Sequence, residues 1–432
     1  MIKIKKSLVI SSAVYFLASG LTHADDLTFK SLSDSELSQV QGQALMNLTY
    51  TDPSKANASM ASQNIGFYKL GMEANVELNA NIKKLQLGCG GINGPGGCDI
   101  DIDHLSLSGL GETREERVGS SAKMTNPFIE FAIKNPNSAS TREMMGFRLS
   151  AEKVLGMLTL GEENTGTPNG INSLSGYMKI QDTTGVGYTA ERNMSYGDTQ
   201  MSINGKVDAK ICVIFCFGSM RLGFSSTDYN LALDSAKADI FINGTTISGK
   251  RLSSVQLDGY ANINQLNFGG NLGATITESF GLLTLQKRVT GNITGLKANI
   301  TVNENLGYIH KLKLNNPFSL SMQKQDIFWN GAAVAAQRGW WLAIEDPIDI
   351  GNVNPTKKID ITNDVLKQVV NPISNYITNN PPSCTVLNCL WGADLTVGNV
   401  NLPNTTVNFP LKDLELQNQT FAPNCYGSLK FC

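Results

Sequence analysis

Histidine is scarce in this chain, and its scarcity excludes most kinds of active site. Three histidines occur among 432 residues, and one of them, His23, lies close to the N-terminus. His104 and His310 are then the only imidazoles for a Ser/His/Asp hydrolase or a zinc site. Neither a Gly-x-Ser-x-Gly nor a His-Glu-x-x-His motif is present. We therefore expect no enzyme activity, no catalytic residue, no cofactor and no metal ion.

Long apolar runs are also lacking, and the clearest short one lies at the N-terminus. Three lysines precede an apolar stretch over 8–17, and Thr22-His23-Ala24 follows with small residues at its first and third positions. The stretch is shorter than the ~20 residues that a membrane-spanning helix needs. We predict a signal peptide over 1–24 and export to the periplasm or the cell surface.

Charged residues are few, at 17% of the chain, and neither sign dominates. Removal of the signal peptide would leave 32 basic residues against 37 acidic ones, a net charge of about −5, which does not attract nucleic acid. The stretch 244–250 has the spacing of a phosphate loop, but Arg251 stands where Ser or Thr would hold Mg²⁺. We expect neither nucleic acid nor nucleotide as a partner.

A run of alternating aspartates is the nearest approach to a metal site. Asp99, Asp101 and Asp103 could present three carboxylates to Ca²⁺ from one strand face. The calcium-loop template requires Gly and Glu where this chain has His104 and Leu110. A solvated strand face is therefore the favoured interpretation.

Cysteine, by contrast, is well represented, with eight residues in four close pairs. The pairs are Cys89 with Cys98, Cys212 with Cys216, Cys384 with Cys389, and Cys425 with Cys432. An even number and short spacings in an exported chain favour disulfides over metal ligands. All eight are disulfide candidates, and a metal held by four thiolates is the rival interpretation.

The pair Cys212 and Cys216 carries a geometric condition. If 211–217 were one extended strand, four steps of ~3.3 Å would place the two Cα atoms ~13 Å apart, beyond the ~7 Å limit for a disulfide. Either 213–215 forms a turn, or these two cysteines have other partners.

Alternation of apolar and polar residues dominates from about residue 49 to 349. It is clearest over 74–87, 99–107, 201–211, 229–242, 255–268 and 291–302. This period buries one face of a strand, and Asn-Gly pairs suit tight turns between strands. Such pairs stand at 93–94, 169–170, 204–205, 243–244 and 330–331. We predict a mainly β fold, a large antiparallel sheet or sandwich assembly with a short N-terminal helix and a helix plus disulfide-rich loops near the C-terminus.

Two helices are expected. Residues 32–43 predict a short one, with Ser33 as its N-cap. Residues 362–377 have apolar positions at helical spacing, interrupted by Pro372, which should end or kink the helix near Val370.

Two further patterns bear on the strands. The sequence Asn-Pro-Phe occurs at 126–128 and at 316–318, each time after a Leu-rich alternating stretch. Two related β units would explain this echo, and so would chance reuse of a signal for the start of a strand. In an extended Trp340-Trp341 pair the rings point to opposite faces, so one of them should be buried.

These patterns divide the chain into five parts. They are a signal peptide (1–24), a short helical lead segment (25–48), a first β-rich unit (49–195), a second β-rich unit (196–350), and a helix with a cysteine-paired C-terminal tail (351–432).

Three stretches taken together resemble a known family. They are the helical segment 32–43, the glycine- and cysteine-rich loop with its flanks (87–103), and the stretch from Asn126-Pro127-Phe128 to Arg148. The combination is similar to the FilA family of pilus-assembly proteins from Acinetobacter-like Gram-negative bacteria, most clearly over 25–160. The resemblance implies a role in the assembly of surface fibres and brings no catalytic motif.

The sequence therefore predicts an exported structural, adhesive or assembly component of a pilus-like organelle (a fimbrium) that acts through β-sheet association. The expected partners are other pilus or envelope proteins, or further copies of the chain. The alternatives are an outer-membrane β-barrel or another envelope β protein, and then an envelope hydrolase that would use His104 or His310.

Overall fold

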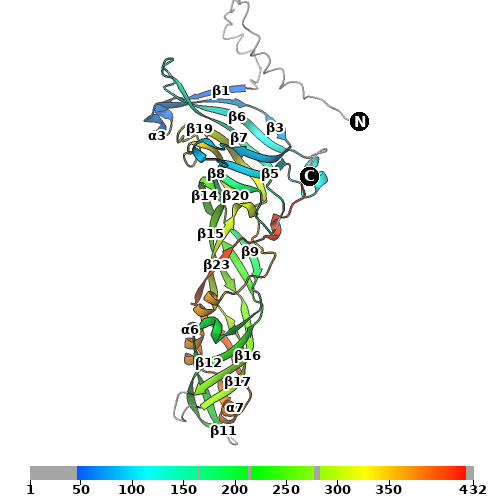
Figure 1. Cartoon of the computed structure of the whole chain (residues 1–432), viewed down its shortest axis with the longest axis vertical. Coiled ribbons are helices and arrows are strands. Elements are labelled where there is room, and N and C mark those ends of the chain that lie inside the picture. Colours follow the sequence, from blue (N-terminus) through cyan, green and yellow to red (C-terminus); the bar gives the residue numbers. More distant parts are fainter. Residues whose placement is uncertain (1–45, 164–165, 213–215, 277–282, 425–432) are drawn as a thin grey trace, which may run out of the picture. The chain divides into compact units, whose positions relative to one another are not determined.

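The computed structural model describes residues 46–163, 166–212, 216–276 and 283–424, and its fold is mainly β, as the alternation predicts (Figure 1). The expected signal peptide and the expected helix over 32–43 lie outside the described residues. The predicted cysteine pair of Cys425 and Cys432 lies outside them as well.

The largest sheet has eleven strands. They are β1 (Met46–Thr51), β2 (Ile65–Met72), β3 (Asn75–Leu78), β4 (Ala80–Leu87), β5 (Ile100–Ser108), β6 (Ala122–Lys134), β7 (Glu143–Thr159), β8 (Ile171–Ile180), β14 (Thr245–Leu252), β19 (Lys311–Gln323) and β20 (Gly339–Ile348). The order is β1-β2-β6-β7-β19-β20-β8-β5-β4, with β3 on β6 and β14 on β8. Because β5 also pairs with β7, the strands β7, β19, β20, β8 and β5 form a closed ring from which β6, β2 and β1 extend as an open sheet.

Two smaller sheets follow. The seven-stranded sheet contains β10 (Arg192–Ser195), β11 (Ile203–Cys212), β12 (Cys216–Leu233), β16 (Gln265–Ile276), β17 (Leu283–Thr294), β21 (Ser383–Thr385) and β22 (Asp394–Asn401). The five-stranded sheet contains β9 (Thr183–Tyr188), β13 (Lys237–Ile242), β15 (Ser254–Ile263), β18 (Lys297–Asn305) and β23 (Thr406–Lys412). Most pairings are antiparallel, whereas β20–β8, β11–β21, β17–β22 and β18–β23 are parallel.

The described helices are short, apart from α6. They are α3 (Ala58–Ala61), α4 (Arg114–Val118), α5 (Tyr196–Thr199), α6 (Asn363–Asn379) and α7 (Val386–Leu390), with 3-10 turns η1 (Pro53–Lys55), η2 (Gly91–Asn93), η3 (Leu306–Tyr308) and η4 (Gln417–Gln419).

Helix α6 continues past the residue that is expected to end it. Thr362 caps its N-terminus by accepting a hydrogen bond from the Val365 amide, and Pro372 lies inside the helix. Proline removes one backbone hydrogen bond, but Ser374 and Ile377 beyond it are buried. Tertiary packing of this apolar face outweighs the local cost, so the helix does not end near Val370, one of the two outcomes expected from Pro372.

One apolar core includes side chains from all three sheets and from α6. A smaller core lies beside it, with Phe67, Trp329 and Trp341 at its centre. Trp341 is buried and Trp340 is half-buried, which agrees with the expectation that the pair points to opposite faces.

The sheets do not follow the expected boundary between residues 195 and 196. Strands β14, β19 and β20 come from the second expected unit and pair with β8 and β7 of the first. All described residues belong to one compact unit. Alternation predicts which residues of a strand face a core, but it does not predict which strands share a sheet.

Some turns and strand boundaries also differ from those that the sequence predicts. Asn204-Gly205 lies inside β11, where Gly205 leaves room for the ring of Phe224, so it is not a turn. The stretch 291–302 contains the end of β17 and most of β18, and 255–268 is likewise divided between β15 and β16.

The two Asn-Pro-Phe sequences lie on strands that are both neighbours of β7. Strands β6 and β19 pair with opposite sides of β7. The register of β19 shifts at its proline, between Asn316 and Phe318, whereas that of β6 runs unbroken past Pro127 and shifts between Ala132 and Ile133. Pro127 and Phe318 are both opposite Ala151. The two repeats therefore flank the same point of one strand.

Candidate functional site

Three of the four cysteine pairs form the expected disulfides. Cys89 is bonded to Cys98, and Cys384 to Cys389, with Cα–Cα distances of 3.9 and 5.5 Å. Cys212 is bonded to Cys216 over a Cα–Cα distance of 4.0 Å. This last pair satisfies the geometric condition because β11 ends at Cys212 and β12 begins at Cys216, so the two residues are opposite each other in a hairpin. The disulfides indicate an oxidising compartment, extracellular or periplasmic.

The fourth cysteine pair is not described by the structure. Cys425 and Cys432 lie outside the described residues, which end at Asn424, so no disulfide is seen for either of them. The bond between Cys425 and Cys432 therefore stays a prediction. It rests only on their spacing and on the oxidised state of the six described cysteines.

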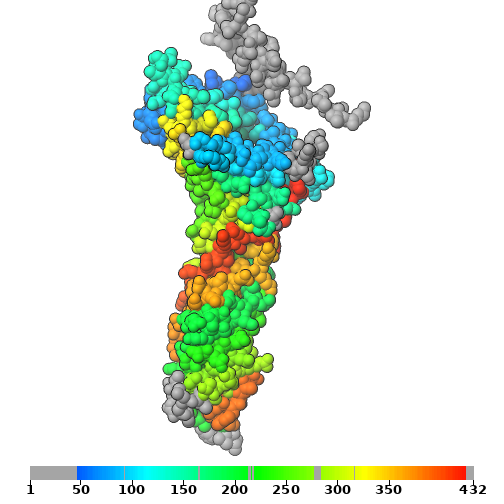
Figure 2. Space-filling view, in the orientation of Figure 1, coloured from blue at the N-terminus to red at the C-terminus, as the bar shows by residue number. Residues whose placement is uncertain are grey.

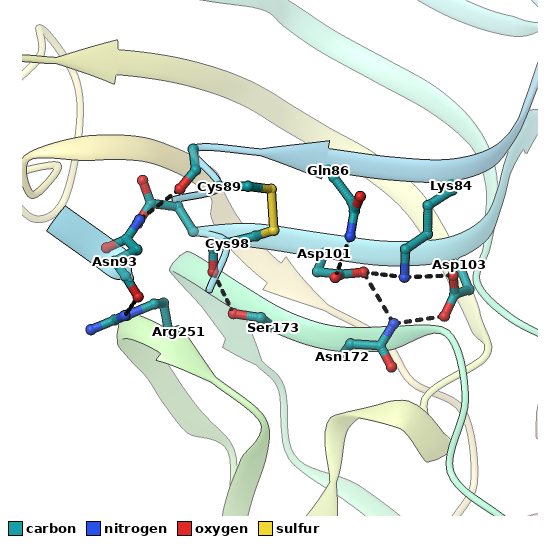
Figure 3. The surroundings of a disulfide bond; sticks show 12 residues. Lys84, Gln86, Cys89, Asn93, Cys98, Asp101, Asp103, Asn172, Ser173 and Arg251 are labelled. Carbon is teal, nitrogen blue, oxygen red and sulfur yellow. Dashed lines mark hydrogen bonds and ion pairs between the residues drawn. A yellow bond between two sulfur atoms is a disulfide. The ribbon is translucent and has the colours of Figure 1, made fainter. Parts of the chain in front are cut away.

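The Cys89–Cys98 disulfide closes the loop between β4 and β5 (Figure 3). Asn93 folds back inside the loop, and its side-chain amide donates to the Gly88 carbonyl at 2.6 Å. Ser173 on β8 donates to the Cys98 carbonyl at 2.9 Å, which ties the base of the loop to the ring of strands. The loop is therefore a braced connection.

The three aspartates do not share one environment. Asp99 is buried and accepts hydrogen bonds from the Trp340 amide at 3.0 Å and from the Asn93 amide group at 3.1 Å. Asp101 and Asp103 are half-buried, and the Lys84 ammonium lies 2.5 and 2.8 Å from their carboxylates. The expected solvated face is thus wrong for Asp99, which holds the start of β5 against β20.

An ion-pair network on the β4–β5 pair uses the other two carboxylates (Figure 3). Burial raises the pKa of the Asp101 carboxyl, but hydrogen bonds from Lys84, Gln86 and Asn172 outweigh it and leave that pKa below its ordinary value. Within the described part of the chain, no three His, Cys, Asp or Glu side chains are grouped as a metal ion would require. The arrangement stabilises the β4–β5 pair.

His104 and His310 occupy different environments within and beside the eleven-stranded sheet. His104 is within β5, with a positive φ of 48°, at the point where the neighbour of β5 changes from β8 to β7. His310 is completely buried next to β19, and its Nδ1 contacts the Leu160 carbonyl at 2.9 Å. Burial lowers the pKa of His310. Its side chain is part of the packing between β7 and β19.

The phosphate-loop stretch is a strand. Residues 245–252 form β14, which pairs with β8 and is followed by β15 instead of a helix. The backbone amides of this segment are committed to a sheet, so the loop that would cradle a phosphate does not form.

A buried arginine anchors the end of the described chain. The Arg117 guanidinium donates to Ser108 at 2.9 Å, to Thr159 at 3.1 Å and to the Ala422 carbonyl at 2.5 Å. Burial lowers its pKa to about 10. In Figure 2 the red end of the chain lies against the cyan segment that contains Arg117.

A buried glutamate lies inside the five-stranded sheet. Glu304 on β18 accepts a hydrogen bond from the Leu414 amide at 3.0 Å, and its second carboxylate oxygen contacts no donor of the described residues. Burial raises its pKa to about 8. The carboxyl is therefore mainly protonated at neutral pH.

The surface feature that stands out is an apolar sheet face on β1, β2, β6 and β7. Two rows of directly opposed side chains cross these strands. One row is Leu48, Leu70, Ile129 and Leu149, and the other is Tyr50, Tyr68, Phe131 and Phe147. We call these eight residues the apolar sheet face.

The two rows continue into the core at one end and reach solvent at the other. On β19 and β20 they extend to Leu320, Leu342 and Trp340, which pack against the main core. On β1 the exposed fraction is 68% for Leu48 and 41% for Tyr50. In the first row, Leu149, Ile129 and Leu70 are exposed to a similar degree, and Leu48 on β1 is the most exposed of the four.

Strand β1 is an edge of the described sheet. Within the described residues it pairs with β2 alone, and its sequence Met-Asn-Leu-Thr-Tyr-Thr contains no charge and no proline. All but the last of its residues are exposed. An unpaired apolar edge is a template for the addition of another strand.

Sequence reasoning misses the start of this strand. It assigns residues 46–48 to the helical lead segment, although they begin the alternation Met46, Leu48, Tyr50. The alternating stretch 291–302, whose place within a sheet the sequence leaves open, is interior, because β17 lies between β16 and β22 and β18 lies between β15 and β23.

Comparison with known proteins provides no relative: no protein-family model, no curated protein and no solved structure matches the chain. In the part of the chain that the structure describes, no helix combines the length and the apolar character needed to cross a membrane. The site must therefore be interpreted from its own geometry.

Proposed function

We propose that this chain is an exported structural, adhesive or assembly component of a bacterial pilus-like organelle, and that it associates through β1. Its partner is another pilus or envelope protein, or a second copy. The observation that carries the proposal is the apolar edge of β1, which pairs with β2 alone among the described residues. A strand with apolar side chains at alternate positions would continue both rows beyond Leu48 and Tyr50 while its backbone pairs with β1.

Two features support this mode of association. The partner strand would gain main-chain hydrogen bonds and would cover two apolar side chains that now face water. The sheet behind β1 is also braced by buried polar contacts, because the Arg148–Glu130 ion pair and Asn330 join β6 and β7 to the loop between β19 and β20. A prepared edge loses little conformational freedom on binding.

The test replaces Leu48 and Tyr50 with lysine, a charged residue that is common on natural edge strands. Leu48→Lys with Tyr50→Lys should abolish association, because a paired strand would bury two unpaired ammonium groups. Cells that produce the wild type should show antibody-labelled surface filaments under electron microscopy, and cells with the double variant should not.

The matched control is Tyr260→Lys. Tyr260 is 43% exposed, close to the 41% of Tyr50, and each tyrosine contacts one cross-strand aromatic ring. Tyr260 is on β15, between β13 and β18, so the control adds a lysine without touching an edge. Filament labelling that survives in the double variant, or is missing from the wild type, contradicts the proposal.

A further inference from the structure

A polar groove lies on the face of the eleven-stranded sheet opposite to the apolar sheet face. Asn47 and Thr49 line it from β1, where they alternate with Leu48 and Tyr50. Its volume is about 430 Å³, within the ~300–1,000 Å³ range of sites for small molecules. The groove can therefore hold a small ligand.

Strand β2 supplies a lysine and a gap to this groove. The Lys69 ammonium lies 3.7 Å from Oε1 of Glu152 and 4.0 Å from the centre of the Phe128 ring. Gly71 is the next residue on the same face, and a Cβ added to it would lie 3.8 Å from Cβ of Phe128, in ordinary contact. The glycine thus leaves open a space between β1 and β6 that a larger side chain would fill.

Two amide–carboxylate pairs line the groove. The Asn126 side-chain amide donates to Glu152 at 2.7 Å and joins β6 to β7. The Asn47 side-chain amide donates to Glu73 at 3.5 Å and joins β1 to the residue that follows β2. Each pair keeps further acceptor positions on its oxygens and a second N–H on its amide. Donors and acceptors are therefore next to each other at two places in the groove.

The charges of the groove favour a neutral ligand. Among its described residues the charged ones are Lys69, Glu73 and Glu152, a net charge of −1, which disfavours an anion. No three His, Cys, Asp or Glu side chains of the described chain are grouped as a metal ion would require. Met72 and Ala74 add a small apolar area that suits the C–H groups of a sugar ring.

We propose that this groove binds a neutral saccharide, whose hydroxyls contact the two amide–carboxylate pairs, Thr49 and Lys69. A hydroxyl both donates and accepts, so neighbouring hydroxyls can use carboxylates, amides and the ammonium together. Most small-molecule sites are mainly apolar, whereas a polar wall suits a ligand that forms hydrogen bonds over most of its surface. The site does not depend on strand addition at β1, because Leu48 and Tyr50 belong to the other face.

The experiment measures the binding of the methyl glycosides of glucose, galactose and mannose to the oxidised, full-length protein by saturation-transfer NMR. Together these probes present equatorial and axial hydroxyls at two ring positions. We expect at least one of them to bind with a Kd on the order of 1 mM, as suits a ligand of this size.

Two further probes test the chemistry of recognition. The same glycoside with every hydroxyl methylated should not bind, because it donates no hydrogen bond and leaves polar groups of the site unpaired. N-acetylneuraminic acid, an anion, should bind about tenfold more weakly or not at all. The proposal is overturned if none of the three glycosides binds, or if the methylated or the anionic compound binds equally well.

One variant tests the location of the ligand. Gly71→Val places a side chain in the groove and should abolish binding, and valine suits a strand, so the fold should persist. The matched control is Gly218→Val on β12, where no atom of the described residues lies within 4 Å of the added Cβ. The control should bind as the wild type does. Saccharide binding that persists in a folded Gly71→Val variant contradicts the location.

A second variant tests the hydrogen-bonding role of a carboxylate. Glu152→Met keeps the length of the side chain but removes its acceptors, so it should weaken binding by about tenfold or more. Lys153→Met changes the next residue of β7, which is exposed on the other face, and should leave binding unchanged. If Glu152 only holds Asn126 and Lys69 in the sheet, the melting temperature will fall while the affinity stays the same, and this role fails.

Discussion

The eleven-stranded sheet ends in β4 at one edge and in β1 at the other, and these two edge strands differ in charge and in the exposure of apolar side chains. β4 carries Lys83 and Lys84 in solvent, and the Lys84 ammonium bridges two carboxylates on β5. The Cys89–Cys98 disulfide ties the end of β4 to β5. β1 has no charge and exposes Leu48 and Tyr50.

This difference in charge bears on which edge can accept another strand. Lysines on an edge strand oppose the addition of another strand, because their charges would have to be desolvated. The β4 edge therefore carries charges that oppose strand addition, whereas the six residues of β1 carry none. Under the proposed function, we expect the sheet to accept a partner strand at β1 and to reject one at β4.

Removing the disulfide should have the largest effect on this comparison. Cys89→Ser with Cys98→Ser frees a loop that, in the chain-entropy model, contributes roughly 2–3 kcal/mol. Amide hydrogen exchange should become faster in β4 and β5 and stay unchanged in β1. The control, Cys212→Ser with Cys216→Ser, opens a hairpin in a different sheet and should leave β4 as it is. Equal loosening of β1 would show that the two edges are not independent.

Removing the lysines should make β4 resemble β1. Lys83→Leu with Lys84→Leu deletes exposed charges and ion pairs worth roughly 0.2–1 kcal/mol each, so the fold should persist. A second association surface should appear, visible as larger species in sedimentation velocity. Lys123→Leu, on interior strand β6, is the matched control and should sediment as the wild type does. A monodisperse double variant would mean that charge is not what closes β4.

Acid should give the smallest effect, again on one edge only. The pKa of Asp101 is lower in the folded chain than its ordinary value of 3.8, so its ion pair stabilises the fold above that pH and is lost as the pH falls through the lowered pKa. β1 contains no carboxylate. As the pH falls from ~5 through this lowered pKa, exchange should therefore accelerate in β4 relative to β1 by an amount that corresponds to less than ~1 kcal/mol. Asp101→Asn should remove this acid dependence, and an identical dependence in the variant would assign it to another group.

The sequence predicts the local features of this molecule and misses the long-range ones. Alternation identifies strands because a period of two follows from backbone geometry, and the pairing of Cys89 with Cys98 is clear because the two are close in sequence. Pairing of β7 with β19 depends on contacts between distant segments, for which a single sequence has no signal. Pro372 misleads for the same reason, since buried side chains beyond it hold the helix together.

The candidate site is hard to see in the sequence for a related reason. The six residues of β1 include three apolar side chains, too few to stand out next to a polar lead segment. Their importance arises from Leu70 and Ile129, which continue the row on strands that are remote in sequence or separated by a turn.

The closed ring of strands also constrains the order in which the chain can fold. Thr159 pairs with Lys311, and β8 needs β20, which ends at Ile348. A chain that emerges from its N-terminus must therefore leave β7 without one neighbour until residues 160–310 have followed it out, which gives a high contact order and slow folding. During this interval the free side of β7 is an unpaired strand edge, which is prone to aggregation.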